Sequence, residues 1–162
     1  MAVLDRRTQI QSAVAMLIAT QAHAKPCPVR HVLFICPLGV VQSAIAREEL
    51  RRAARARGFS VIVQSRGVEP PRDPSSDISP ALASHLRGDG INTIADPLRK
   101  MTREDVAKAD ITIAFNEAAQ APGLEGARQW KSPSWNSKYD EAKAALAVNI
   151  QALMQELAAQ NC

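Results

Sequence analysis

Short apolar runs of strand length alternate along this chain with longer segments whose apolar residues recur at helical spacing, and this alternation restricts the possible folds strongly. The runs are rich in Val, Ile and Phe, as is typical of strands buried on both faces. They occupy residues 29–35 (VRHVLFI), 59–65 (FSVIVQS) and 111–115 (ITIAF).

Helical periodicity fills the intervals between these runs. We predict helices at residues 43–57, 81–87, 102–109 and 140–160. The apolar stripe of the last helix is assigned mainly to Ala144, Leu146, Ile150, Leu153 and Leu157. Apolar strands alternating with helices indicate an α/β fold, with a doubly wound parallel sheet flanked by helices. We see no internal repeat and no domain break, so residues 25–162 are expected to form a single domain.

The amino-acid composition supports one core and argues against a nucleic-acid partner. Of the 162 residues, 46% are apolar, which is enough for one domain core. Only 4% are aromatic, which leaves few rings on which bases could stack. The net charge of +4 is modest, and the basic stretch 47–57 also contains Glu48 and Glu49. We therefore interpret this stretch as a solvated helix face, and we expect no nucleic-acid binding.

The first 24 residues resemble an export signal. Arg6 and Arg7 precede an uncharged apolar run at 13–19 (AVAMLIA), and Ala22 and Ala24 are small residues of the kind that a signal peptidase recognises. A run of seven residues is too short to cross a bilayer, so no membrane span is expected. The prediction is a periplasmic or secreted protein. The alternative is a cytoplasmic protein with a frayed N-terminal helix.

The segment from Cys36 to Ser43 follows the first predicted strand, at the sheet edge where ligands of α/β folds bind. It places a thiol at the strand end, a loop with one glycine, and a hydroxyl at the start of a helix. Backbone amides at a helix N-terminus attract anions and favour the thiolate form of a cysteine nearby. The pattern indicates a nucleophile below an anion site, although a cysteine at this position is also compatible with an ordinary core residue.

Several motifs occur together in this chain: the Cys36 loop and Ser43 with Ala44-Ile45-Ala46, then Ser65-Arg66-Gly67, and then residues 98–105 (LRKMTRED) with Ala109-Asp110-Ile111. Together they resemble the low-molecular-weight protein-tyrosine phosphatases and their arsenate-reductase relatives. The resemblance covers about residues 30 to 157. The resemblance implies hydrolysis of phosphotyrosine or aryl phosphates through a Cys36 phosphothiol intermediate. Ser43 would then steady the thiolate. The implied phosphate-binding residues are Leu38, Gly39, Val40, Val41 and Gln42.

This sequence departs from the family pattern at the positions where the chemistry is concentrated. Gln42 stands where the family loop has arginine, and Pro37 has no N–H to donate. Arg66, after the second strand, could bring a guanidinium from another direction, or it could be an exposed loop residue. The family's Asp-Pro general acid is missing; Asp140 is the carboxylate within reach by sequence, with a helix N-cap as its other interpretation.

We therefore expect phosphatase activity to be weak or lost. The alternatives are a non-catalytic pseudophosphatase that binds an anion or a phosphorylated partner, and a thiol redox protein. Residues 37–161 contain no cysteine, which argues against a thiol relay for arsenate. The cysteines and histidines have no zinc-ligand spacing, so no metal and no other cofactor is expected. The sequence does not indicate an oligomeric state.

Cys27 and Cys162 are expected to come close. Cys27 precedes the first strand, at the amino edge of a parallel sheet. The last helix, in this family, starts from a loop over the active site and runs back to that amino edge, where it ends at Cys162. An exported protein would hold them as a disulfide. The alternative is two unpaired thiols.

Overall fold

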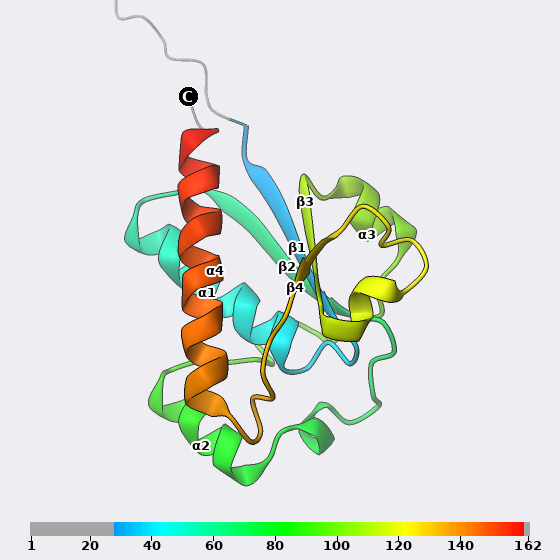
Figure 1. The fold of residues 1–162 in the computed structure, drawn as a ribbon, viewed down its shortest axis with the longest axis vertical. Coiled ribbons are helices and arrows are strands. Elements are labelled where there is room, and N and C mark those ends of the chain that lie inside the picture. Colours follow the sequence, from blue (N-terminus) through cyan, green and yellow to red (C-terminus); the bar gives the residue numbers. More distant parts are fainter. Residues whose placement is uncertain (1–27, 161–162) are drawn as a thin grey trace, which may run out of the picture.

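The computed structural model describes residues 28–160 and contains one four-stranded sheet with helices on both faces (Figure 1). All strand pairs are parallel, and the order across the sheet is β2-β1-β3-β4. The strands are β1 (Arg30–Cys36), β2 (Val61–Gly67), β3 (Ile111–Phe115) and β4 (Arg128–Trp130). The predicted doubly wound parallel α/β fold is confirmed. The short strand β4 was not predicted, because its sequence RQW has no apolar run.

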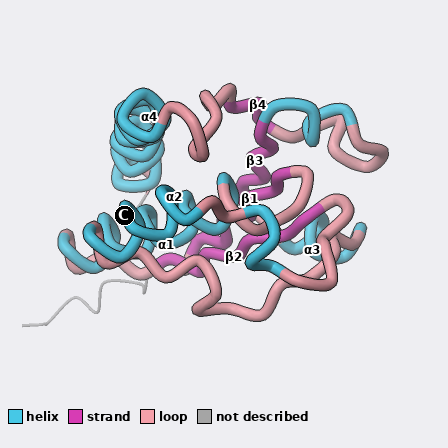
Figure 2. The backbone as a smooth tube through the Cα atoms, turned by 90° about the horizontal axis from the view of Figure 1, so that it is seen from below, coloured by secondary structure: helices cyan, strands magenta, loops and turns pink. Residues whose placement is uncertain are grey.

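Between residues 28 and 160, six helical segments connect and flank the strands. They are α1 (Gln42–Ala56), the 3-10 helix η1 (Pro74–Asp77), α2 (Pro80–Gly88), α3 (Arg103–Lys108), the 3-10 helix η2 (Asn116–Gln120) and α4 (Tyr139–Ala159). Figure 2 shows α1 and α4 on one side of the sheet and α3 on the other. The four α-helices correspond to the predicted ones, within a few residues at each end.

The core has two layers because alternate side chains of β1 point to opposite faces of the sheet. Val32 and Phe34 face α1 and α4, where Ile45 and Leu50 of α1 are fully buried. Leu33 and Ile35 face the other layer, which is formed partly by η2 and the loop after it. Burial on both faces explains why the strand is a nearly continuous apolar run.

The carboxyl end of β1 is the place where the chain direction across the sheet changes. β1 pairs with β2 on one side and with β3 on the other, and the chain leaves β1 through α1 toward β2. In the register, Cys36 lies opposite Gly67 and Ile35 lies opposite Ala114. Cys36 is therefore located at a switch point of the sheet, where α/β folds form ligand crevices.

The basic stretch of α1 is only partly a solvated face, so the sequence interpretation was wrong for two of its arginines. Arg47 is 2% exposed, and Arg51 is half-buried against Asp96 with a distance of 2.7 Å between Nη2 and a carboxylate oxygen. These guanidinium groups donate hydrogen bonds to hydroxyl, carbonyl and carboxylate oxygens, and these bonds offset the cost of burying the charge. Arg55 and Arg57 are exposed, as expected.

Two details of α4 also differ from the sequence analysis. Ala144 is exposed, whereas Ala142 and Met154 are buried beside the predicted leucines and isoleucine. The N-cap position is occupied by Lys138 without a side-chain cap, so Asp140 lies in the first turn and is not the cap. A carboxylate in the first turn still interacts favourably with the helix dipole.

The export signal expected at residues 1–24 lies outside the described residues, as does the pair Cys27 and Cys162, and both predictions stay untested. Figure 1 shows the start of β1 and the end of α4 at the same end of the molecule. From residue 28 to residue 160, no helix combines the length and apolar character needed to cross a membrane.

Candidate functional site

The loop between Cys36 and Gln42 lies directly on the backbone of β2. Gly39 has a φ of +77°, and a Cβ built on it would lie 2.6 Å from the Gly67 nitrogen. A Cβ on Gly67 would in turn lie 2.6 Å from the Leu38 carbonyl oxygen. The Val68 N–H donates to the Cys36 carbonyl at 3.1 Å, which ties the two segments together. The loop conformation therefore depends on two glycines that approach one another.

Cys36 and Ser43 are brought together at the base of this loop. The Cys36 thiol is 3% exposed, and its Sγ is 3.1 Å from Ser43 Oγ. The Gly39 N–H also donates to Cys36 Sγ at 3.1 Å. The sulfur thus has two polar neighbours, a hydroxyl and a backbone amide, and both can hydrogen-bond to a thiolate.

The predicted phosphate-binding residues divide between two hollows. Leu38, Val41 and Gln42 line the pocket that Cys36 also lines. Gly39 and Val40 instead line a neighbouring hollow between the loop and the 93–98 segment. Gln42 is the first residue of α1, so its amide stands at the helix N-terminus beside the pocket.

Arg66 does not reach the pocket. Its guanidinium is directed away to Asp105, with 2.8 Å between Arg66 Nη2 and the carboxylate oxygen, and only its backbone carbonyl accepts a hydrogen bond from Ser43. Burial opposes ionisation of Asp105, but hydrogen bonds from Arg66 and Thr102 keep the pKa of Asp105 below its ordinary value. The strand alternation decides the direction, because Ser65 and Gly67 face α1 and Arg66 faces the opposite layer.

Asp140 does not line the pocket either. It is exposed on the first turn of α4, and two other carboxylates line the pocket instead. Asp77 comes from the end of η1 and Glu117 from η2. Sequence reasoning missed both residues, because each lies in a short 3-10 segment with no recognisable motif.

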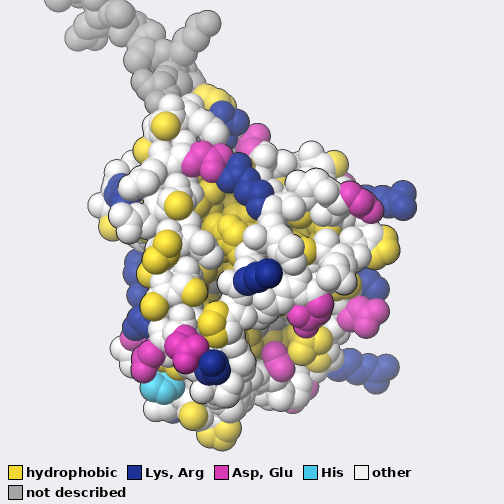
Figure 3. Space-filling view, in the orientation of Figure 1, with side chains coloured by type: hydrophobic (Ala, Val, Ile, Leu, Met, Phe, Trp, Pro, Cys, Tyr) yellow, Lys and Arg dark blue, Asp and Glu magenta, His cyan; other side chains and the backbone are white. Residues whose placement is uncertain are grey.

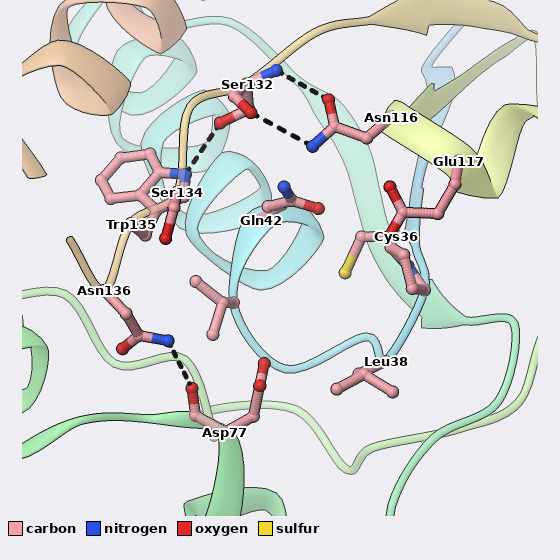
Figure 4. Close-up of a pocket in the computed structure, with 12 residues that line it drawn as sticks. Cys36, Leu38, Gln42, Asp77, Asn116, Glu117, Ser132, Ser134, Trp135 and Asn136 are labelled. Atoms are coloured by element: carbon pink, nitrogen blue, oxygen red, sulfur yellow. Dashed lines mark hydrogen bonds between the residues drawn. The ribbon is translucent and has the colours of Figure 1, made fainter. Parts of the chain in front are cut away.

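The pocket has a volume of about 300 Å³ and opens beside the Cys36 thiol (Figure 4). Its lining includes two carboxylates and no lysine or arginine. The lining residues are Cys36, Pro37, Leu38, Val41, Gln42, Asp77, Asn116, Glu117, Ser132, Ser134, Trp135 and Asn136. Burial raises the pKa of the half-buried Asp77. No group of His, Cys, Asp and Glu in the described part of the chain has an arrangement that could hold a metal ion.

Asn116 holds in place the part of the pocket wall that contains Ser132. Its φ is +50°, and its side chain makes two hydrogen bonds to the backbone of Ser132. The Ser132 N–H donates to Oδ1 at 2.9 Å, and Nδ2 donates to the Ser132 carbonyl at 3.1 Å. The Trp135 indole N–H then donates to Ser132 Oγ at 3.1 Å. Ser132 therefore presents a neutral, already bonded hydroxyl to the pocket.

Asn136 connects the same wall to the η1 segment. The Ser79 N–H donates to Asn136 Oδ1 at 2.9 Å, and Asn136 Nδ2 donates to the Asp77 carbonyl at 3.0 Å. This second bond is drawn in Figure 4. The two asparagines join loops that are far apart in the sequence, so sequence analysis had no local signal by which to find them.

These features define a class of protein: a parallel α/β domain with a cysteine-centred loop at the switch point of its sheet. The family model for low molecular weight phosphotyrosine protein phosphatases matches residues 31–159, and the chain belongs to this family. The family expected from the sequence motifs is thereby confirmed. No curated protein matches the chain.

Solved structures with the same fold include phosphatases and arsenate reductases. YfkJ from Bacillus subtilis has a TM-score of 0.63 and 16% identity, with 82% of this chain and 97% of that chain covered. A thioredoxin-dependent arsenate reductase from Corynebacterium glutamicum has a TM-score of 0.60 and 24% identity, covering 80% of this chain and 62% of that chain.

A low molecular weight protein tyrosine phosphatase from T. tengcongensis has a TM-score of 0.58 and 20% identity, with 78% of this chain and 99% of that chain covered. At these identities the likeness establishes the fold and not the activity.

Proposed function

We propose that this chain is a phosphatase-family protein that keeps the Cys36 pocket but hydrolyses phosphotyrosine or aryl phosphates very slowly or not at all. The observation that carries this proposal is the pocket lining, which contains Gln42 at the head of α1 and no lysine or arginine. Any hydrolysis that remains would pass through a Cys36 phosphothiol intermediate.

The missing cation matters because phosphoryl transfer is catalysed mainly by electrostatic stabilisation. An arginine offers a charged, planar fork that binds two phosphate oxygens, whereas the Gln42 amide offers one neutral donor group. Losing a single preorganised donor of this kind commonly costs about a hundredfold to a thousandfold in rate. Asp77 and Glu117 add to this loss, because their negative charges repel a phosphate dianion.

Protonation of the leaving group is also weakened. Ser132, followed by Pro133, occupies the loop facing Cys36, and a serine hydroxyl is a poor general acid at neutral pH. Asp77 and Glu117 are carboxylates in the same pocket, but neither belongs to that loop. The contacts of Cys36 with Ser43 and Gly39 therefore support ligand binding without turnover better than they support hydrolysis.

The test is turnover of para-nitrophenyl phosphate by wild type, Gln42→Arg and Cys36→Ser. We expect wild type to be close to Cys36→Ser, and Gln42→Arg to exceed wild type by about tenfold or more because it restores the charged fork. Gln151→Arg, which adds the same charge on the exposed side of α4, is the matched control and should have no effect. Wild-type turnover far above Cys36→Ser and unchanged in Gln42→Arg would contradict the proposal.

A further inference from the structure

The charge of the Cys36 pocket is opposite to that of the molecule. The chain has 20 lysines and arginines against 16 aspartates and glutamates. Figure 3 shows basic and acidic side chains spread together over one face of the molecule. The pocket lining nevertheless includes Asp77 and Glu117 and no basic residue. These two carboxylates oppose the attraction of the α1 N-terminus for anions, so the charged side chains of the lining disfavour a dianion and favour a cation.

Both pocket carboxylates are available to a ligand. Within residues 28–160, neither the Asp77 nor the Glu117 carboxylate has a hydrogen bond or an ion pair, whereas Asp96 is paired with Arg51 and Asp105 with Arg66. Figure 4 shows Glu117 beside Cys36, with Asp77 on another side of the cavity. A cation between them would satisfy charges that the protein leaves unpaired, and burial already disfavours the charged form of Asp77.

The remaining lining is consistent with a small organic cation. The side chains of Asn116 and Asn136 are already hydrogen-bonded to backbone groups. Gln42 and Ser134 are therefore the neutral polar residues of the lining that can bind a ligand. Leu38, Val41 and Trp135 add apolar surface. Lys131 is in a neighbouring hollow, on the other side of Ser132, and does not line this pocket. A volume of about 300 Å³ accommodates one ring or a short alkyl arm with its head group.

We infer that the Cys36 pocket binds a ligand with an ammonium or guanidinium head group in preference to a phosphate dianion. This inference rests on the proposed function only in placing the ligand at the same, catalytically impaired site. It assigns Asp77 and Glu117 as the residues that select the charge of the ligand.

The first test measures the charge selectivity of Cys36 directly. In a Cys27→Ser/Cys162→Ser background, Cys36 is the single thiol of the chain. Its thiolate attacks the sulfenyl sulfur of a methanethiosulfonate, forms a mixed disulfide and releases methanesulfinate. Two reagents are compared: 2-aminoethyl methanethiosulfonate, whose ammonium group is a cation at neutral pH, and 2-sulfonatoethyl methanethiosulfonate, which is an anion. The rate constant of each reagent with Cys36 is divided by its rate constant with a free thiol in solution. Both rates scale with the same thiolate fraction, so their ratio reports only the electrostatics of the pocket.

We expect the normalised ratio to favour the cation by about tenfold, as two unit charges near the sulfur would produce. Asp77→Asn and Glu117→Gln should each lower this ratio several-fold, and Glu104→Gln, on the exposed side of α3, should leave it unchanged. Circular dichroism checks that the variants are folded. A ratio of one or below, or a ratio that neither pocket variant changes, would overturn the inference.

The second test uses reversible probes. Benzamidine should slow the alkylation of Cys36 by neutral iodoacetamide, and inorganic phosphate at the same concentration should not. Protection by phosphate without protection by benzamidine would reject the cationic ligand. The proposed loss of turnover would still be decided separately by the Gln42→Arg comparison, so the two claims fail independently.

Discussion

Gly67 shows how one missing side chain shapes the site. Its register partner in β1 is Cys36, and its Cα faces the carbonyl of Leu38. The close approach of these backbones allows the Cys36 loop to fold against β2. A side chain at position 67 would push the loop away from the sulfur. Gly67 therefore acts on the site through backbone packing, without contacting a ligand.

Gly67→Ala is expected to destabilise the protein by about 2 kcal/mol, because the new methyl group forces the backbone apart. It should also change the rate of Cys36 alkylation by iodoacetamide. Urea denaturation and alkylation kinetics measure the two effects. Gly88→Ala, at a position where an added Cβ meets nothing within 4 Å, should change stability little. Equal effects of both substitutions would refute this role for Gly67.

Helix α1 combines the head of the site with a buried charged network. Its first turn carries Gln42 and Ser43, and one turn later Arg47 enters the core. Arg47 donates to Ser65 Oγ at 2.8 Å and to the Thr93 carbonyl at 3.1 Å, and its Nε is 2.8 Å from Glu48 Oε1. The helix is thus attached to β2 and to the segment before α3 by hydrogen bonds as well as by apolar packing.

Arg47→Met should lower the free energy of unfolding by about 3 kcal/mol, since it keeps the apolar stem but leaves buried acceptors without a donor. Chemical denaturation measures this. Arg55→Met, on the exposed side of the same helix, is the matched control and should stay within about 0.5 kcal/mol of wild type. A similar small effect at both positions would show that the Arg47 network contributes little.

The pocket is assembled from segments that meet at the carboxyl edge of the sheet. The loop after β1, η1, η2 and the loop before α4 each contribute side chains to it. Asn136 joins two of these segments across 57 and 59 positions of sequence. These two long-range bonds hold the loop before α4 against the η1 segment.

Asn136→Ala removes both bonds and should cost about 1–2 kcal/mol, because two hydrogen bonds are lost where the backbone groups can be rehydrated. The η1 segment should loosen, so that Cys36 reacts faster with iodoacetamide. Ser137→Ala, at the exposed neighbouring position, provides the control. Unchanged alkylation with unchanged stability would indicate that Asn136 is dispensable for the pocket.

Local periodicity was sufficient for most of the fold. The strand at Ile111–Phe115 was predicted with its exact bounds, and β1 and β2 were shifted by only one or two residues. These strands are buried on both faces, so burial leaves a continuous apolar run in the sequence. β4 is three residues long and mostly exposed, so its pairing with β3 depends on distant residues and leaves no such pattern.

The same distinction applies to the site. Cys36, Gln42 and Ser43 lie within one strand-loop-helix unit, so their proximity followed from the sequence. Arg66 and Asp140 lie outside the pocket, because the alternation of β2 and the starting point of α4 decide where their side chains point. Asp77 and Glu117 line the pocket but were not predicted, because they come from separate loops. Contacts within a unit follow from chain geometry, whereas the meeting of separate loops at a sheet edge follows from the packing of the whole domain.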